Sequence, residues 1–309
     1  MKIDIIIPCY NARKTIGRTL SSICLQKNYK DISVYLINDC SDYDYNFYID
    51  FFSNFIKIKE IKTNKNVGPG EARNIGIDKG NNKYIIFIDS DDNLATRTAI
   101  QDLYEKIEST KQNVVISNFI YSNNNKKYIK RNDYAWLHGK IYRRKFLEEN
   151  NIRFNNTRAN EDNGFNSLIF LLTDKVLFYD KITYVYNENP NSITRKNNNE
   201  YNISGLEGLT INMNWAIKEA IKRGANKKEG LILAINTLEA MYNYYNYFYN
   251  KYDVTNIIKW SINTKKFIDT FEDNDIKYKE LEKKEDYKKS SNKISFQEFL
   301  SKIDNYISE

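Results

Sequence analysis

The sequence has one histidine and three cysteines, and each scarcity excludes a class of site. A single imidazole disfavours zinc chemistry built on histidines. Cys9, Cys24 and Cys40 are odd in number and lack the spacing of a metal site. No apolar run reaches the roughly 18 residues of a transmembrane helix, and the N-terminus opens on a strand without a signal-peptide pattern. We therefore expect a cytoplasmic protein with reduced thiols.

The net charge is +7, and basic residues are concentrated between Lys126 and Lys145. Such a stretch can face phosphates, nucleic acid or the anionic inner face of a membrane, which leaves nucleic-acid binding and peripheral membrane contact as predictions. It equally fits a solvated face in a chain rich in lysine and asparagine. The charge pattern alone does not separate these alternatives.

Residues 84–92 join a short apolar run to the carboxylates of Asp89, Asp91 and Asp92. The run is typical of a buried strand in a parallel sheet. The acids then follow the carboxyl end of that strand, where open α/β sheets bind ligands. Clustered carboxylates with no His or Cys near them in the sequence favour Mg²⁺ or Mn²⁺ holding a phosphorylated substrate. The alternative is that the three acids only cap the next helix.

Strand and helix patterns alternate over the first part of the chain, which predicts βαβ units and a mostly parallel sheet flanked by helices. Residues 121–131 have the pattern of a polar strand or hairpin, and residues 136–150 contain a predicted helix. A second helix is predicted over residues 165–172, followed by one or two strands over residues 175–186. From about residue 205 only helical periodicity remains. We predict an α/β domain over residues 1–200 and a helical region over residues 201–309.

Five motifs occur in an order that resembles family 2 glycosyltransferases with the GT-A fold. They are DIIIPCYN at 4–11, LINDCSD at 36–42, NVGPGEARNIG at 66–76, FIDSDD at 87–92 and the Glu161–Asp162 pair. The resemblance covers residues 1 to about 195. It implies a Rossmann-like GT-A domain with a nucleotide-binding half over residues 1–95 and an acceptor half over residues 96–200.

The resemblance also implies an activity, which is metal-dependent, inverting transfer from a UDP-sugar to a saccharide or other hydroxyl acceptor. Asp162 would be the general base, and Asp91 with Asp89 would hold Mn²⁺ or Mg²⁺. The implied donor-binding residues are Pro8, Tyr10, Asp39, Arg73, Asp89, Ser90 and Arg195, the last in a segment that closes over the donor phosphates. The implied acceptor-side residues are Trp136, His138, Lys140 and Glu161.

Two departures from the family pattern fall in the second motif, where Asn38 replaces an Asp and Cys40 replaces a Gly. Asp39 is kept, and the family uses this residue to accept a hydrogen bond from uracil N3–H. The Q-x-x-R-W motif of processive polysaccharide synthases is missing, which favours the transfer of a single sugar.

Structural roles are the alternative for each of these residues. Glu161 and Asp162 can cap a helix, Arg73 can pair with an acid of the second-strand loop, and Trp136 can belong to the core with His138 as an ordinary hydrogen-bonded residue. A tyrosine cluster in the helical region fits helix packing first, a homo-oligomer second and acceptor binding third. Its members are Tyr242, Tyr244, Tyr245, Tyr247 and Tyr249.

The predicted acceptor is a cell-envelope glycan, a teichoic acid or a lipid-linked saccharide, with protein or modified DNA as further alternatives. Two other functions fit the sequence. One is a basic nucleic-acid-binding protein whose acids are structural, and the other is a glycosyltransferase-like scaffold that binds nucleotide without turnover.

Overall fold

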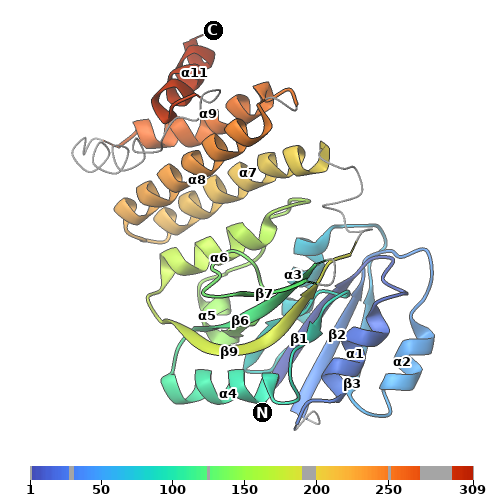
Figure 1. Cartoon of the computed structure of the whole chain (residues 1–309). Coiled ribbons are helices and arrows are strands. Elements are labelled where there is room, and N and C mark those ends of the chain that lie inside the picture. Colours follow the sequence, from blue (N-terminus) through green and yellow to red (C-terminus); the bar gives the residue numbers. More distant parts are fainter. Residues whose placement is uncertain are drawn as a thin grey trace. The chain divides into compact units, whose positions relative to one another are not determined.

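The computed structural model describes residues 2–27, 31–123, 126–189, 200–249, 252–271 and 294–308. The chain forms two compact units, Met1–Pro190 and Asn191–Glu309 (Figure 1). The first is an α/β unit, and the described part of the second is helical. This confirms the predicted α/β class with a C-terminal helical region.

The first unit alternates strands and helices as the sequence predicts. Its elements are β1 Ile3–Cys9, α1 Ile16–Cys24, β2 Ile32–Asn38, α2 Asn46–Phe52, β3 Lys57–Lys62, α3 Pro69–Lys79, β4 Tyr84–Phe87, β5 Asn93–Leu94, α4 Ala99–Thr110, β6 Val114–Asn123, β7 Lys126–Lys130, β8 Lys140–Arg143, α5 Arg144–Glu149, α6 Glu161–Leu172 and β9 Val176–Asn187.

These strands form one sheet in the order β3-β2-β1-β4-β8-β6-β9-β5, with β7 paired to β6. Strands β3, β2, β1 and β4 are parallel. Beyond β4 the sheet is mixed, because β8 runs antiparallel to both β4 and β6. The sequence analysis predicted a helix within residues 136–150, and α5 lies there, but it did not predict the strand Lys140–Arg143 that precedes this helix. This strand is almost wholly buried and therefore shows no polar–apolar alternation.

Successive side chains of β1 point to opposite faces of the sheet. Ile5 and Ile7 belong to the core that α1 and α4 cover. Ile6 points to the opposite face, where α3 packs so closely that a Cβ on Gly76 would lie 2.3 Å from Ile6 Cγ2. Glycine at position 76 is thus required for the contact between α3 and the sheet.

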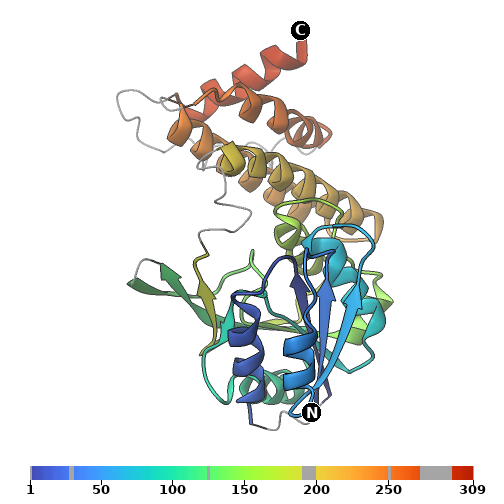
Figure 2. The same cartoon turned by 90° about the vertical axis from the view of Figure 1, so that its right-hand side faces the viewer.

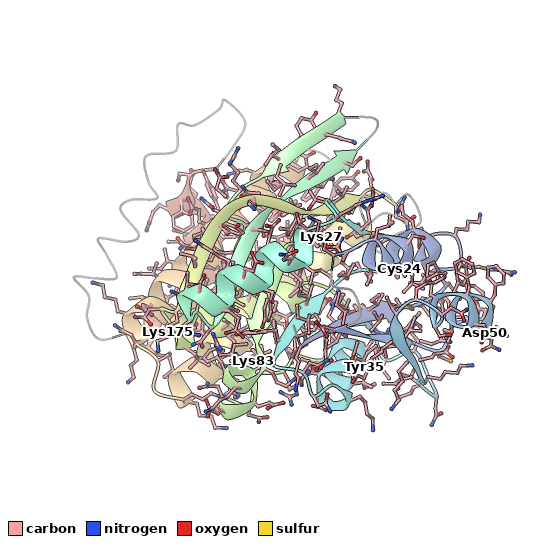
Figure 3. All side chains as sticks on the ribbon, turned by 90° about the horizontal axis from the view of Figure 1, so that it is seen from below. Cys24, Lys27, Tyr35, Asp50, Lys83 and Lys175 are labelled. Carbon is pink, nitrogen blue, oxygen red and sulfur yellow. The ribbon has the colours of Figure 1, made fainter. Side chains whose placement is uncertain are left out.

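The predicted hairpin is present as the distal half of β6 paired with β7, and it projects from the sheet (Figure 2). The three cysteine thiols are free. Cys9 is buried in β1, Cys24 is half-buried at the end of α1 (Figure 3), and Cys40 is exposed.

The second unit contains α7 Glu200–Lys222, α8 Lys227–Phe248, α9 Thr255–Asp269 and α11 Phe296–Ser308. Within the tyrosine cluster, Tyr242 and Tyr245 are buried and contact Phe299 of α11. Tyr244, Tyr247 and Tyr249 are exposed. The cluster is therefore divided between helix packing and solvent. In the described ranges, no helix is long and apolar enough to cross a membrane.

Candidate active site

Asp39 follows β2 and fixes the start of α3. Its carboxylate accepts hydrogen bonds from the backbone N–H groups of Val67 at 2.7 Å and Gly68 at 2.9 Å, and from the Thr63 hydroxyl at 3.0 Å. Gly68 has φ of 93°, a value that favours glycine. The structure thus gives Asp39 a clear structural role, and its contact with uracil stays a prediction.

The turn after β2 explains one of the departures from the family pattern. The Asn38 side-chain oxygen accepts a hydrogen bond from the Ser41 N–H at 3.0 Å, and its amide nitrogen donates to Glu60 Oε1 at 2.9 Å. An aspartate at position 38 would place a second carboxylate against Glu60 and would repel it. The asparagine amide instead donates a hydrogen bond to Glu60. Cys40 occupies the left-handed region with φ of 58°, where the family has glycine.

Arg73 of α3 connects the two acidic segments of the site. Its guanidinium lies 2.6 Å from Asp89 Oδ1 after β4 and 2.8 Å from Glu161 Oε1 at the start of α6. Arg73, which is 5% exposed, and Glu161 are buried, and Asp89 is half-buried. Burial alone would lower the pKa of Arg73, but the two carboxylates outweigh it and raise that pKa. Arg73 therefore forms a salt bridge, but its partners are Asp89 and Glu161. The predicted partner was an acid of the second-strand loop.

The contact between α3 and α6 depends on a glycine. A Cβ on Gly70 would lie 3.0 Å from Glu161 Cγ and 3.1 Å from the Asn155 carbonyl oxygen. Only a residue without a side chain leaves Glu161 room to reach Arg73. The Gly-rich loop therefore brings the two helix starts together.

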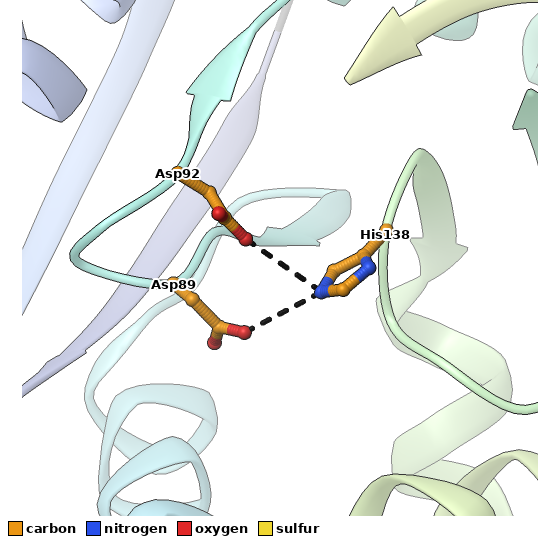
Figure 4. A group of neighbouring side chains, drawn as sticks. All are labelled: Asp89, Asp92 and His138. Carbon is orange, nitrogen blue, oxygen red and sulfur yellow. Dashed lines mark ion pairs between the residues drawn. The ribbon is translucent and has the colours of Figure 1, made fainter. Parts of the chain in front are cut away.

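His138 lies between two of the three acids that follow β4 (Figure 4). Its Nε2 is 3.5 Å from Asp89 Oδ2 and 3.6 Å from Asp92 Oδ2. The imidazole stacks on Tyr184 with ring centroids 4.8 Å apart. Burial would raise the pKa of Asp89, but Arg73 and His138 outweigh it and hold that pKa well below its usual range. Asp89 is therefore a permanent anion at neutral pH.

Asp92 has both carboxylate oxygens occupied. The Tyr184 hydroxyl donates to Oδ2 at 2.7 Å, and the Asn187 N–H donates to Oδ1 at 2.8 Å. The side chain is fully buried, and burial together with Asp89 and Asp91 raises its pKa well above the usual value. Asp92 therefore ties β9 to the end of the central strand.

Asp91 is half-buried and points elsewhere, with Oδ2 accepting a hydrogen bond from Asn189 Nδ2 at 3.0 Å. Burial and the charge of Asp89 raise its pKa. Three neighbouring carboxylates opposed mainly by Arg73 form a site that a divalent cation fits. Two donor sets overlap there. One is the predicted pair Asp89 and Asp91, and the other is Asp89, Asp92 and His138, whose ligand atoms lie within 4.8 Å of one another.

Asp162 lies in the first turn of α6, next to Glu161. Burial and the adjacent Glu161 charge raise its pKa to about 7, while Arg73 acts in the opposite direction. A carboxylate with this pKa can accept a proton at neutral pH. Asp162 also accepts a hydrogen bond from the Asn163 N–H at 2.8 Å, within the first turn of the helix, whereas the N-cap residue is Asn160.

Two of the predicted acceptor-side residues, the half-buried Trp136 and the buried His138, belong to an aromatic cluster. Trp136 contacts Phe119 at 5.7 Å, His138 at 5.3 Å and Tyr186 at 5.7 Å between ring centroids. Lys140 is fully buried and donates to the Trp136 carbonyl oxygen, so it holds the segment that carries Trp136. Burial lowers the pKa of Lys140 to about 8, against the charges of Asp133 and Asp162. Direct acceptor contacts of these residues stay predictions.

The remaining predicted donor residues are distributed around the same strand ends. Tyr10 is 46% exposed, whereas Pro8 and Ser90 are half-buried. Arg195 and its loop lie outside the described residues. The sequence analysis missed Tyr184, Asn187 and Asn189, which hold Asp92 and Asp91 from the end of β9. The only local signal in the sequence was the strand-like pattern of Tyr184, Val185 and Tyr186, which comes directly before Asn187 at the end of β9.

The sequence matches the family model for glycosyl transferase family 2 over residues 4–162, which is more than half of the chain. The chain belongs to this family. The match ends on Asp162, so it includes the Asp89–Arg73–Glu161 connection and every motif on which the resemblance rests. The predicted family membership is confirmed.

Curated relatives match part of this family 2 chain. Glycosyltransferase GlyA of Streptococcus pneumoniae is 27% identical over 227 residues, which cover 63% of this chain and 32% of GlyA. The poly(ribitol-phosphate) beta-N-acetylglucosaminyltransferase TarS of Staphylococcus aureus is 25% identical over 208 residues, which cover 60% of this chain and 35% of TarS. The matched regions thus span about a third of the length of these two relatives.

Solved structures show a similar fold for this family 2 chain. Residues 1–349 of TarS in complex with UDP-GlcNAc match with a TM-score of 0.75 at 17% identity, covering 100% of this chain and 92% of that one. The mannosyltransferase PcManGT of Pyrobaculum calidifontis, in complex with GDP-Man and Mn²⁺, matches with a TM-score of 0.55 at 13% identity, covering 86% and 85%. The predicted GT-A fold is confirmed by the match to TarS.

Proposed function

We propose that this chain transfers a single sugar from a UDP-sugar to a hydroxyl group of an acceptor, with inversion at the anomeric carbon and with a divalent cation. The observation that carries the proposal is the buried connection from Asp89 through Arg73 to Glu161, which sets the acidic strand end opposite Asp162. Family membership supports the reaction class, and the raised pKa of Asp162 supports its role as base.

In the proposed reaction the acceptor oxygen forms a bond to C1 of the sugar while the bond from C1 to the diphosphate oxygen breaks. UDP leaves, and the acceptor proton passes to the Asp162 carboxylate. A base with a pKa near 7 is largely ionised just above neutral pH and still binds the proton well. One direct displacement inverts the configuration at C1.

Asp91 and Asp89 are the proposed ligands for Mn²⁺ or Mg²⁺. When bound, such a cation neutralises charge on the leaving diphosphate. We favour Asp91 over Asp92, because both oxygens of Asp92 already accept hydrogen bonds from Tyr184 and Asn187. Arg73 holds Asp89 in place and fixes a positive charge beside the predicted nucleotide site.

For the donor, we propose that Asp39 contacts the uracil, with Pro8, Tyr10 and Ser90 lining the nucleotide and Arg195 reaching its phosphates. The relative TarS supports this choice, because its structure contains UDP-GlcNAc. The proposed acceptors are a cell-envelope glycan, a teichoic acid or a lipid-linked saccharide. A cytoplasmic location, peripheral contact with the membrane, a homo-oligomer through the C-terminal helices and nucleic-acid binding stay predictions.

The test is UDP release from a panel of UDP-sugars, with Mn²⁺ and with EDTA. We expect release from at least one donor, loss of release with EDTA and loss in Asp91→Ala. Asp50→Ala is the matched control, because Asp50 is an exposed acid on α2. A protein that releases no UDP from any donor but binds DNA with salt-sensitive affinity would contradict the proposal.

A further inference from the structure

A basic two-stranded ribbon extends from the acceptor half of the first unit. It consists of residues 119–123 of β6 paired with Lys126–Lys130 of β7 (Figure 2). Every side chain of β7 is exposed. Exposed lysines are common on protein surfaces and carry no ligand by themselves. The arrangement of these lysines relative to the active site is what distinguishes the ribbon.

The strand register assigns the ribbon side chains to two faces. Phe119 is opposite Lys130, and Tyr121 is opposite Tyr128. Opposed residues share a face in an antiparallel pair, and side chains alternate along each strand. One face therefore presents Phe119, Tyr121, Lys126, Tyr128 and Lys130, which we call the inner face.

The inner face continues into the candidate active site. The Lys130 ammonium lies 5.8 Å from the centre of the Trp136 ring, whose centroid is 5.3 Å from that of His138. His138 Nε2 in turn is 3.5 Å from Asp89. A row of cations and aromatic rings thus leads from the ribbon to the acidic strand end.

The inner face carries two cations, Lys126 and Lys130, and no acid. Within the described part of the chain, neither of these lysines forms an ion pair with an acid. Lysines that alternate with aromatic rings suit a chain in which phosphates alternate with hydroxyl-rich units, because cations bind phosphates and rings pack on polyol or sugar carbons.

We propose that the acceptor is a phosphodiester-linked polyol or sugar chain, and that Lys126 and Lys130 bind its phosphates while Tyr128 contacts the unit between them. The proposal rests on the proposed function, whose acceptor it specifies. Lys126 and Lys130 are separated by roughly 13 Å along the strand, so they contact a chain and not a single sugar. A bilayer fits less well, because Tyr128 and Ile129 are consecutive in the strand and face opposite sides.

The proposal is tested by binding alone, with no sugar donor present. Poly(ribitol phosphate) is titrated into the full chain at 0.15 M salt, and the Kd is measured for the wild type, Lys130→Glu, Lys126→Glu/Lys130→Glu and Lys127→Glu. Lys127→Glu is the matched control, because it makes the same charge change in the same strand on the outer face. Circular dichroism melting confirms that each variant is folded.

We expect Lys130→Glu to raise the Kd about tenfold, the double variant to raise it further, and Lys127→Glu to change it less than about threefold. Equal losses in Lys130→Glu and Lys127→Glu would overturn the proposal. So would equal binding of uncharged dextran, or tighter binding of anionic vesicles or of duplex DNA through the same lysines. Binding through the inner face with no UDP release from any donor would leave this inference standing and refute the proposed function.

Discussion

The guanidinium of Arg73 lies 2.8 Å from the Glu161 carboxylate, although 88 positions separate these residues in the chain. The same guanidinium lies 2.6 Å from Asp89. One buried cation therefore sets the distance between the strand end that carries the metal-ligand candidates and the helix that carries Asp162. Arg73 is both a structural residue and a fixed charge of the site.

Loss of Arg73 should destabilise the protein strongly. Arg73→Ala leaves Asp89 and Glu161 without their partner in a largely buried setting, so we expect the free energy of unfolding to fall by about 3 kcal/mol. Arg153→Ala is the control, because Arg153 contacts Asp78 at the same 2.8 Å but closer to solvent, and we expect a change below about 1 kcal/mol. Urea denaturation measures both, and similar losses would contradict the importance of the buried connection.

The pH dependence of stability should report Asp162. Its pKa is raised from 3.8 to about 7 in the folded protein, so between these values the folded state binds a proton that the unfolded chain has lost. This contribution to stability grows as pH falls and is lost as pH rises through about 7. Asp162→Asn removes it, and we expect the variant to be more stable than the wild type at pH 8, on the order of 2 kcal/mol, with no gain at pH 4.

The matched control for that experiment is Asp50→Asn, which changes an exposed aspartate of α2. Urea denaturation at pH 4, 6 and 8 measures all three proteins. A stability difference between wild type and Asp162→Asn that does not depend on pH would show that Asp162 titrates normally.

The two overlapping donor sets make opposite predictions for metal binding. We expect Asp91→Asn to weaken Mn²⁺ binding in the presence of UDP by about tenfold or more, and His138→Gln to change it much less. The electron paramagnetic resonance signal of free Mn²⁺ gives the affinity directly. The opposite result would be that Asp92→Asn and His138→Gln lose the ion while Asp91→Asn keeps it. That result would assign the metal to Asp89, Asp92 and His138.

Replacing Cys40 in the turn after β2 by glycine, the residue of the family pattern, should stabilise the protein. Cys40 has φ of 58°, so Cys40→Gly should raise the free energy of unfolding by about 0.5 to 1 kcal/mol. Cys24→Gly makes the same substitution at the last residue of α1, where the backbone is helical and the side chain packs against the core, and should lower the free energy of unfolding by about 1 kcal/mol. A loss of stability in both variants would mean that Cys40 makes contacts that offset its strained backbone.

The sequence was sufficient to predict the alternating strands and helices, the helical C-terminal region and the family, because these depend on local periodicity and on motif order. It did not predict how Asp92 is held. Tyr184 reaches Asp92 across 92 positions, and this contact depends on the antiparallel pairing of β5 with β9. Strand register of this kind leaves no mark in the local pattern.

The sequence also did not predict which charged residues are buried. Lys140 looked like a surface cation within a basic stretch, yet it is fully buried beneath Trp136. The strand that contains Lys140 was not predicted, so the direction of its side chain was not predicted either. The Arg73–Glu161 pair was missed for a related reason, since nothing between positions 73 and 161 indicates that α3 and α6 meet.

The most direct test of the account is the rate of UDP release by Asp162→Asn, measured with Mn²⁺, the active UDP-sugar and its acceptor, together with the anomeric configuration of the wild-type product by proton NMR. The account predicts a rate at least about 100-fold below that of the wild type, and a product inverted relative to the donor. An Asp162→Asn enzyme that retains the wild-type rate, or a product with the configuration of the donor retained, would contradict it.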